Sequence, residues 1–231
     1  MTSRSGPRGC LVILLALAGP PRALAADVAH PTVVELFQSQ GCSSCPPANA
    51  NLLALASRPD VLALSWQVTY WDHLGWTDTF GKPEFTERQR DYARAFHRDQ
   101  VFTPEIVVNG QADVVGNRRD ELDRLISRAD RGNEGPSIAL AGSAVTVSAA
   151  PGARVLLVRY DPALVQVPIA RGENGGLTLP HRNVVRELVL LGVTDGQPGR
   201  FRLPPASRPG LRSAVLVQAG LGGPILAAAR E

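Results

Sequence analysis

The stretch "GCSSCPPA" at residues 41–48 holds the side chains whose types and spacing could do chemistry. Cys42 and Cys45 are three residues apart, in a chain that has three cysteines in all. Residues at this spacing share one face of a helix, so the two sulfurs can meet. The partial positive charge at a helix N-terminus stabilises a thiolate and lowers the pKa of the cysteine. The pattern therefore favours thiol–disulfide exchange, in which the outer, more exposed Cys42 attacks and the deeper Cys45 resolves the mixed disulfide.

Two other uses of the cysteine pair stay open. The pair can be an inert structural disulfide in a non-catalytic binding or assembly protein, or it can hold a metal ion, since Cu(I) accepts two thiolates. Zn²⁺ needs about four ligands, and the histidines show no paired spacing; they are His30, His73, His97 and His181. We therefore predict no metal site and no cofactor, and a metal-handling protein is the least favoured of the three hypotheses.

Residues 1–25 have the pattern of a secretory signal peptide. Arg4 and Arg8 precede a short apolar run at 11–18, and a small-x-small cleavage pattern follows at 23–25. The run is shorter than the roughly 20 apolar residues that span a bilayer. We therefore expect export to the periplasm or the cell exterior, where disulfides persist. No later run is long and apolar enough to predict a membrane span in the mature chain.

Cleavage would change the charge and the cysteine content of the chain. It removes Cys10 and three arginines, so that 24 Lys and Arg against 21 Asp and Glu become 21 against 21. Binding to nucleic acid needs a basic patch, so we predict no such partner. Residues 26–135 carry 11 basic and 16 acidic side chains, whereas residues 136–231 carry 10 and 5. Opposite net charges favour docking of the two segments on each other.

The elements that must position the motif alternate between strands and helices. Apolar and β-branched runs predict buried strands at 30–37 and 60–66, and helical spacing predicts helices at 48–58, 84–98 and 117–132. Asn109-Gly110 predicts a hairpin over 105–116. This order implies parallel pairing and an α/β layer over residues 28–132, with an insertion around 67–100.

The second segment has a different character. From residue 136 to 231, helical spacing fades and short apolar runs alternate with Pro and Gly, which predicts a small β-sandwich-like domain. The fold class expected is therefore α/β plus all-β. The most distinctive stretch of the second segment is "RGENGGLTLPHRNVVREL", which we interpret as a structural loop between strands. His181 and Arg182 are the alternative, as a contact surface facing the first domain.

Five motifs together resemble one family of secreted bacterial proteins, the domain-of-unknown-function family 1223. They are "VVELFQSQGCSSCPPA", "YWDHLGW", "RQRDYA", "VFTPEIVVNG" and "RGENGGLTLPHRNVV", and the resemblance extends from about Val33 to Arg230. It implies export and a thioredoxin-like first domain, and it implies no particular activity.

The resemblance to the thioredoxin superfamily also implies roles for residues outside the motif. Pro104 would be cis and face the CxxC helix, and Thr103 would offer backbone hydrogen bonds to a bound peptide. Glu35, in the strand before the motif, would be a buried acid that shuttles a proton to the resolving cysteine. Trp71 and Trp76 could form a rim that binds a peptide or small thiol, although aromatic side chains more often serve packing.

The hypothesis that the sequence favours is an exported thiol–disulfide oxidoreductase, or a redox-active binding protein. Its partners would be thiols and disulfides of proteins or small molecules. If the second domain covers part of the CxxC face, it would restrict which partners reach Cys42.

Overall fold

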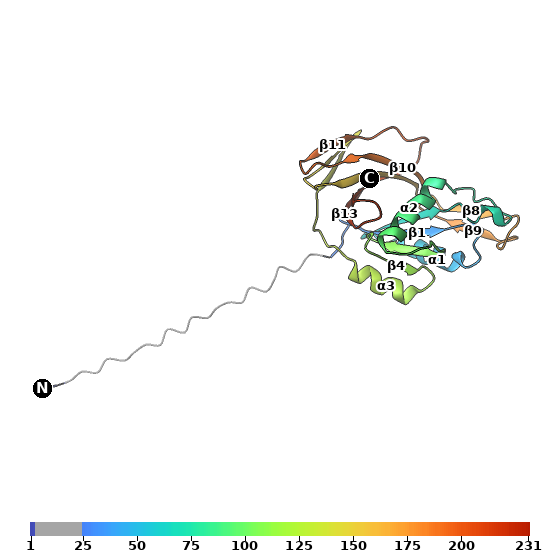
Figure 1. Cartoon of the computed structure of the whole chain (residues 1–231), viewed down its shortest axis with the longest axis horizontal. Helices are drawn as coiled ribbons and strands as arrows, with labels where there is room; N and C mark the ends of the chain where they lie inside the picture. The colour runs from blue at the N-terminus through green and yellow to red at the C-terminus, as the bar shows by residue number, and fades with distance from the viewer. Residues whose placement is uncertain (3–24) are drawn as a thin grey trace.

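The computed structural model describes residues 1–2 and 25–231 (Figure 1). The predicted signal peptide falls almost entirely on residues 3–24, which lie outside the described residues together with Cys10, so export stays a prediction. Within the described part of the chain, no helix has the length and apolar character needed to cross a membrane.

The first half follows the element order that the sequence predicts. Pro83 starts the second helix, and Pro46 and Pro47 lie in the first turn of the first helix, where a missing N–H costs little. Asn109 and Gly110 form the hairpin turn, at φ angles of 48° and 61°. The elements are β1 (Thr32–Gln38), α1 (Cys45–Leu55), β2 (Val61–Gln67), the 3-10 helix η1 (Asp72–Leu74), α2 (Pro83–Ala95), β3 (Glu105–Val108), β4 (Ala112–Val115) and α3 (Arg119–Arg128).

The second half consists of strands, as its short apolar runs predict. They are β5 (Ile138–Ala141), β6 (Ala144–Val147), β7 (Ala153–Asp161), β8 (Val165–Pro168), β9 (Thr178–His181), β10 (Val184–Val193), β11 (Gly199–Arg202), β12 (Arg212–Ala219) and β13 (Ile225–Arg230).

One mixed sheet runs through both halves, in the order β13-β12-β7-β10-β2-β1-β3-β4. Strand β1 pairs with β2 in parallel and with β3 antiparallel. Strand β10 joins β2 through a short parallel contact, with Val184 opposite Ser65. This contact occupies the free edge of β2, whose backbone groups would otherwise lack partners. The two segments that the sequence treats as separate domains therefore share a sheet, and the architecture confirms a mixed α/β fold with further antiparallel sheets.

The two faces of the sheet bury different sets of apolar side chains, because successive residues of a strand point to opposite sides. Val34 and Leu36 of β1 pack with α1 and α3. Val33 and Phe37 pack with α2 and with strands of the second half, including Leu156 of β7. The largest core cluster thus contains residues from both halves of the chain.

A three-stranded sheet, in the order β11-β6-β5, covers the other face of the C-terminal strands. Val145 and Val147 of β6 pack against Val155 and Leu157 of β7 in a cluster separate from the main core. This layer has the sandwich-like packing expected for residues 136–231, although one of its two sheets is the shared one.

Side chains also tie the two halves together. Arg230 donates to the carbonyl oxygens of Val61 at 3.0 Å and Pro59 at 2.6 Å. Asn183 donates to the carbonyl oxygen of Ala63 at 2.8 Å. Cohesion between the halves thus rests on strand pairing, apolar packing and these hydrogen bonds, in addition to any attraction between their opposite net charges.

Candidate functional site

Cys42 and Cys45 form a disulfide at the start of α1, with their Cα atoms 5.4 Å apart. Strand β1 leads into the motif, and α1 begins at Cys45 itself. The N–H of Cys45 donates to the carbonyl oxygen of Cys42 at 3.1 Å, which closes the turn between the two cysteines. Both sulfurs therefore lie at the N-terminal end of an 11-residue helix, as the spacing predicts.

Both cysteines are buried. Cys42 is 0% exposed and Cys45 is 2% exposed. The expectation that Cys42 is the more exposed of the two is wrong for this state of the protein. The reason lies in the segments that pack around the motif, which come from the loop before β3, the loop after β2 and the hairpin β8–β9.

The loop before β3 brings Thr103 to the sulfur of Cys42. The hydroxyl of Thr103 donates to Cys42 Sγ at 3.3 Å, and Trp71 Nε1 donates to the same hydroxyl oxygen at 2.8 Å. Ser44 Oγ lies 3.4 Å from Cys42 Sγ. The Thr103–Pro104 bond is cis, as expected. The structure thus brings Trp71 and Thr103 together at the motif.

The loop after β2 packs against the residues just before the motif. Trp76 Nε1 donates to the side-chain oxygen of Gln40 at 2.9 Å. The N–H of Gln40 donates to Asp78 at 2.7 Å, and the N–H of Phe80 donates to the same carboxylate at 2.9 Å. Burial raises the pKa of Asp78 to about 6, because it penalises the charged form more than these hydrogen bonds favour it.

The β8–β9 connection lies against the CxxC turn. The buried amide of Asn174 donates to the carbonyl oxygens of Gln40 at 2.8 Å and Cys42 at 2.9 Å. Glu173, which is exposed, accepts from the N–H of Ser43 at 3.1 Å and from its hydroxyl at 2.6 Å. These contacts join positions about 130 residues apart, and they place residues 171–176, which we term the cover loop, on the motif.

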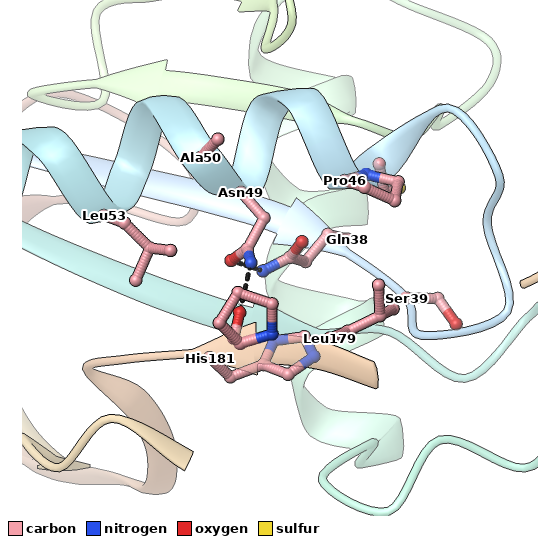
Figure 2. Close-up of a pocket in the computed structure, with 10 residues that line it drawn as sticks. Gln38, Ser39, Pro46, Asn49, Ala50, Leu53, Leu179 and His181 are labelled. Carbon is pink, nitrogen blue, oxygen red and sulfur yellow. Dashed lines mark hydrogen bonds between the residues drawn. The ribbon is translucent and has the colours of Figure 1, made fainter. Parts of the chain in front are cut away.

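A cavity of about 50 Å³ lies beside Cys45, between α1 and β9 (Figure 2). Asn49 of α1 donates to the carbonyl oxygen of Pro180, and Gln38 donates to Asn49 at 3.0 Å. His181 lines the same cavity and is 1% exposed. Among the residues that the structure describes, neither ring nitrogen of His181 has a hydrogen-bond partner. Burial, together with the charge of Arg186, lowers the pKa of His181 to about 4.

Glu35 is buried on β1, as the proton-relay hypothesis requires, but its oxygens are already bound. Arg88 donates to one oxygen at 2.7 Å and to the other at 2.9 Å, and the hydroxyl of Tyr92 donates to the second. The hydrogen bonds found within residues 25–231 do not link Glu35 to either cysteine. The structure therefore places Glu35 in a buried ion pair on the α2 face of the sheet.

A second buried acid follows Pro104 directly. Glu105 is 1% exposed and accepts from Gln89 at 2.6 Å. Burial, together with the neighbouring Asp113, raises the pKa of Glu105 to about 8 against the opposing effects of Gln89 and Arg98. Glu105 is therefore mostly protonated at neutral pH.

No group of three or more His, Cys, Asp or Glu side chains that could hold a metal ion occurs in the described part of the chain. His181 shares a cavity with Cys45, and Cys42 does not line that cavity.

Three residues at the site were missed or given another role from the sequence: Glu173, Asn174 and His181. All three lie in "RGENGGLTLPH", which stood out as distinctive but was interpreted as a structural loop. Its concentration of Gly with isolated polar side chains was the only signal available. Nothing local in that stretch indicates that it lies against residues 40–45.

Comparison with known proteins places the whole arrangement in one family. The solved structure of protein AGR_C_4864 from Agrobacterium tumefaciens is similar, with a TM-score of 0.70 and 33% identity over 87% of this chain and 94% of that chain. HBP35 of Porphyromonas gingivalis shares the fold, with a TM-score of 0.58 and 14% identity over 88% of this chain and 75% of that chain. No curated protein matches the sequence. The model of the family described as "Protein of unknown function (DUF1223)" matches residues 33–218, which include the CxxC motif, Thr103-Pro104 and the cover loop, and the chain therefore belongs to that family.

Proposed function

We propose that this chain is an exported, thioredoxin-like thiol–disulfide oxidoreductase or redox-active binding protein. In the reduced motif, Cys42 attacks the disulfide of a protein or small molecule and Cys45 resolves the mixed disulfide; in the oxidised motif, the thiolate of a partner attacks Cys42 Sγ and Cys45 leaves. The hydroxyl of Thr103 contacts Cys42 Sγ, the cis Pro104 follows Thr103, and Trp71 positions the hydroxyl of Thr103. Glu35 is left out of the reaction because Arg88 and Tyr92 occupy its oxygens.

The observation that carries the proposal is the hydrogen bond from Thr103 to Cys42 Sγ at 3.3 Å. A donor to sulfur favours the thiolate over the thiol, and the N-terminus of α1 acts in the same direction. An inert disulfide has no need of such a donor. The thioredoxin-like assignment is supported by the parallel pair β1–β2 around α1 and by the antiparallel β3 that follows Thr103-Pro104.

The burial of both cysteines favours a second candidate, a non-catalytic binding or assembly protein with a structural disulfide. A partner cannot reach a sulfur that is 0% exposed unless a neighbouring segment moves. The cover loop is the segment we assign to that movement, because it is an exposed connection held by few side chains.

The reduction potential of the disulfide separates the two candidates. It is measured by equilibration with dithiol buffers in the full chain carrying Cys10→Ser, so that only the motif titrates. Structural disulfides lie below about −300 mV and labile ones above. We expect a value above this limit, and a lower value would support the structural disulfide.

Trapping in the cell envelope tests the assigned roles and the export at once. A Cys45→Ser variant should hold a partner as a mixed disulfide through Cys42, and the matched Cys42→Ser variant should not. Equal trapping by both variants, or by neither, contradicts the assignment.

A further inference from the structure

Resolution of a mixed disulfide by Cys45 requires a group that accepts the proton of its thiol, and the proposed function assigns no residue to that task. The thiolate, not the thiol, is the nucleophile, so Cys45 must lose its proton before it attacks. Glu35, the acid expected for this task, has its oxygens bound by Arg88 and Tyr92. The proton acceptor must therefore be sought among the groups that share a cavity with Cys45.

His181 is the titratable side chain that lines the cavity beside Cys45. A neutral imidazole carries one nitrogen that accepts a hydrogen bond and one that donates. Buried polar atoms nearly always have partners, and both ring nitrogens of His181 lack one among the described residues. The cavity, at about 50 Å³, exceeds the roughly 10–15 Å³ that one water molecule requires, so it has room for water that carries the proton from Cys45 to His181.

We propose that His181 is the base that accepts the proton of the Cys45 thiol when Cys45 displaces a partner sulfur from Cys42. This assignment rests on the thiol–disulfide exchange proposed above. In the step, Cys45 Sγ forms a bond to Cys42 Sγ and the bond from Cys42 Sγ to the partner sulfur breaks. The partner leaves with the electron pair of that bond, and the proton held by His181 neutralises it. The motif is oxidised to the disulfide and the partner is reduced to a thiol.

The surroundings of His181 keep the imidazole neutral, which is the form that can accept a proton, although they also make it a weak base. Neither α1 nor β8, which flank it, contains a charged residue. Phe80 packs edge-on to the imidazole, with ring centres 5.8 Å apart, and the Arg186 guanidinium lies 3.9 Å from the centre of the Phe80 ring. Arg186 is the charged group that lowers the pKa of His181, and Asp78, Asp161 and Arg208 in turn shift the pKa of Arg186.

The test separates the two steps of exchange with glutathione disulfide as the probe. The full chain with Cys10→Ser is reduced and mixed with the probe, and samples are quenched with acid. Release of the first glutathione reports attack by Cys42, and release of the second reports attack by Cys45. In a His181→Gln variant we expect the first step to be unchanged within about twofold. The second step should slow by about 100-fold at pH 7, the lower end of the range for general bases, because a base of lowered pKa is a weak one.

The pH profile distinguishes a base from a residue that only packs. Without a base, the rate of the second step follows the thiolate fraction of Cys45 and rises about tenfold per pH unit below the pKa of that thiol. With His181 in place, the profile between pH 5 and 8 should be flatter. Leu179→Val, a change in the same cavity wall without a titratable group, is the matched control and should keep the flatter profile.

The outcomes for the proposed function and for His181 differ. If the unaltered chain releases no first glutathione, the proposed exchange fails and the role of His181 fails with it. If His181→Gln releases both glutathiones at the rates and with the pH profile of the unaltered chain, only the role of His181 is overturned.

A measurement on the unaltered histidine covers the case in which His181→Gln does not fold. The imidazole signals of the Cys10→Ser chain are titrated by NMR with the motif oxidised and then reduced. We expect the titration of His181 to change on reduction, because a thiol replaces the disulfide in its cavity, while the exposed His97 serves as the reference and stays unchanged. An unchanged His181 titration overturns the proposal.

Discussion

Removal of the Asn174 amide should make the Cys42–Cys45 disulfide more reactive by loosening the cover loop. Asn174 is 3% exposed and donates two hydrogen bonds to the CxxC turn, at 2.8 Å and 2.9 Å. Each such bond contributes about 0.5–1.5 kcal/mol net. An Asn174→Ala variant should therefore lower the free energy of opening the loop by about 1–3 kcal/mol. Since 1.4 kcal/mol corresponds to a factor of ten, the open population should rise by about 5-fold to 150-fold.

The assay is the rate at which dithiothreitol reduces the disulfide of the full Cys10→Ser chain. If opening precedes attack, the rate rises by the same factor as the open population. Glu173→Ala removes an exposed contact to Ser43 and should change the rate by no more than a few fold. Asn51→Ala is the matched control, because it removes an amide-to-carbonyl bond of 2.9 Å to Gly116 and leaves the cover loop intact.

Two results would refute the reasoning. An unchanged rate in Asn174→Ala would show that the cover loop does not limit access to Cys42. An equal acceleration in Asn51→Ala, at equal loss of global stability, would show that reduction proceeds through global unfolding and not through opening of the loop.

Three further predictions concern the scaffold. The pKa of Glu105 is raised to about 8 in the folded protein, so the folded state keeps a proton that the unfolded state loses above about pH 4.5. The contribution of the protonated Glu105 to stability is therefore full below about pH 4.5 and is lost as the pH rises to about 8. The free energy of unfolding falls by up to about 1.4 kcal/mol per pH unit in this window. Urea unfolding at pH 5.5 and 7.5 should show a smaller pH slope in Glu105→Gln, and an identical slope would contradict the assignment. Arg88→Met should lower the free energy of unfolding in urea by about 3–5 kcal/mol, because it leaves Glu35 buried without its partner. The double variant with Glu35→Leu should recover part of this free energy. A loss below about 1 kcal/mol in Arg88→Met would refute the prediction. Gly222→Ala would place a Cβ 2.1 Å from the carbonyl oxygen of Asp91, at a φ of +66°. We expect the free energy of unfolding to fall by about 1–3 kcal/mol and both halves still to unfold in one thermal transition. Two separate transitions would show that the shared sheet does not couple the two halves.

The sequence by itself determined the elements that depend on neighbours along the chain. Strand and helix periodicity located β1, α1, β2, α2 and α3, and Asn109-Gly110 located the β3–β4 turn. The cysteine pair at the start of α1 followed from its spacing and the two prolines behind it. These features are local, because periodicity, turn chemistry and capping act over a few residues.

The tertiary structure decided which distant segments meet at the motif. Whether β10 pairs with β2, and whether Asn174 and His181 lie beside residues 40–45, depends on contacts between distant positions: Val184 and Ser65 are 119 residues apart, and Asn174 and Cys42 are 132 apart. Such contacts form only where buried faces fit and backbone edges find partners, and no short window of sequence encodes either condition. The same rule explains the two wrong expectations at the site: the exposure of Cys42 depended on the three segments that pack around the motif, and the availability of Glu35 depended on Arg88 of α2, which lies 53 residues away in sequence.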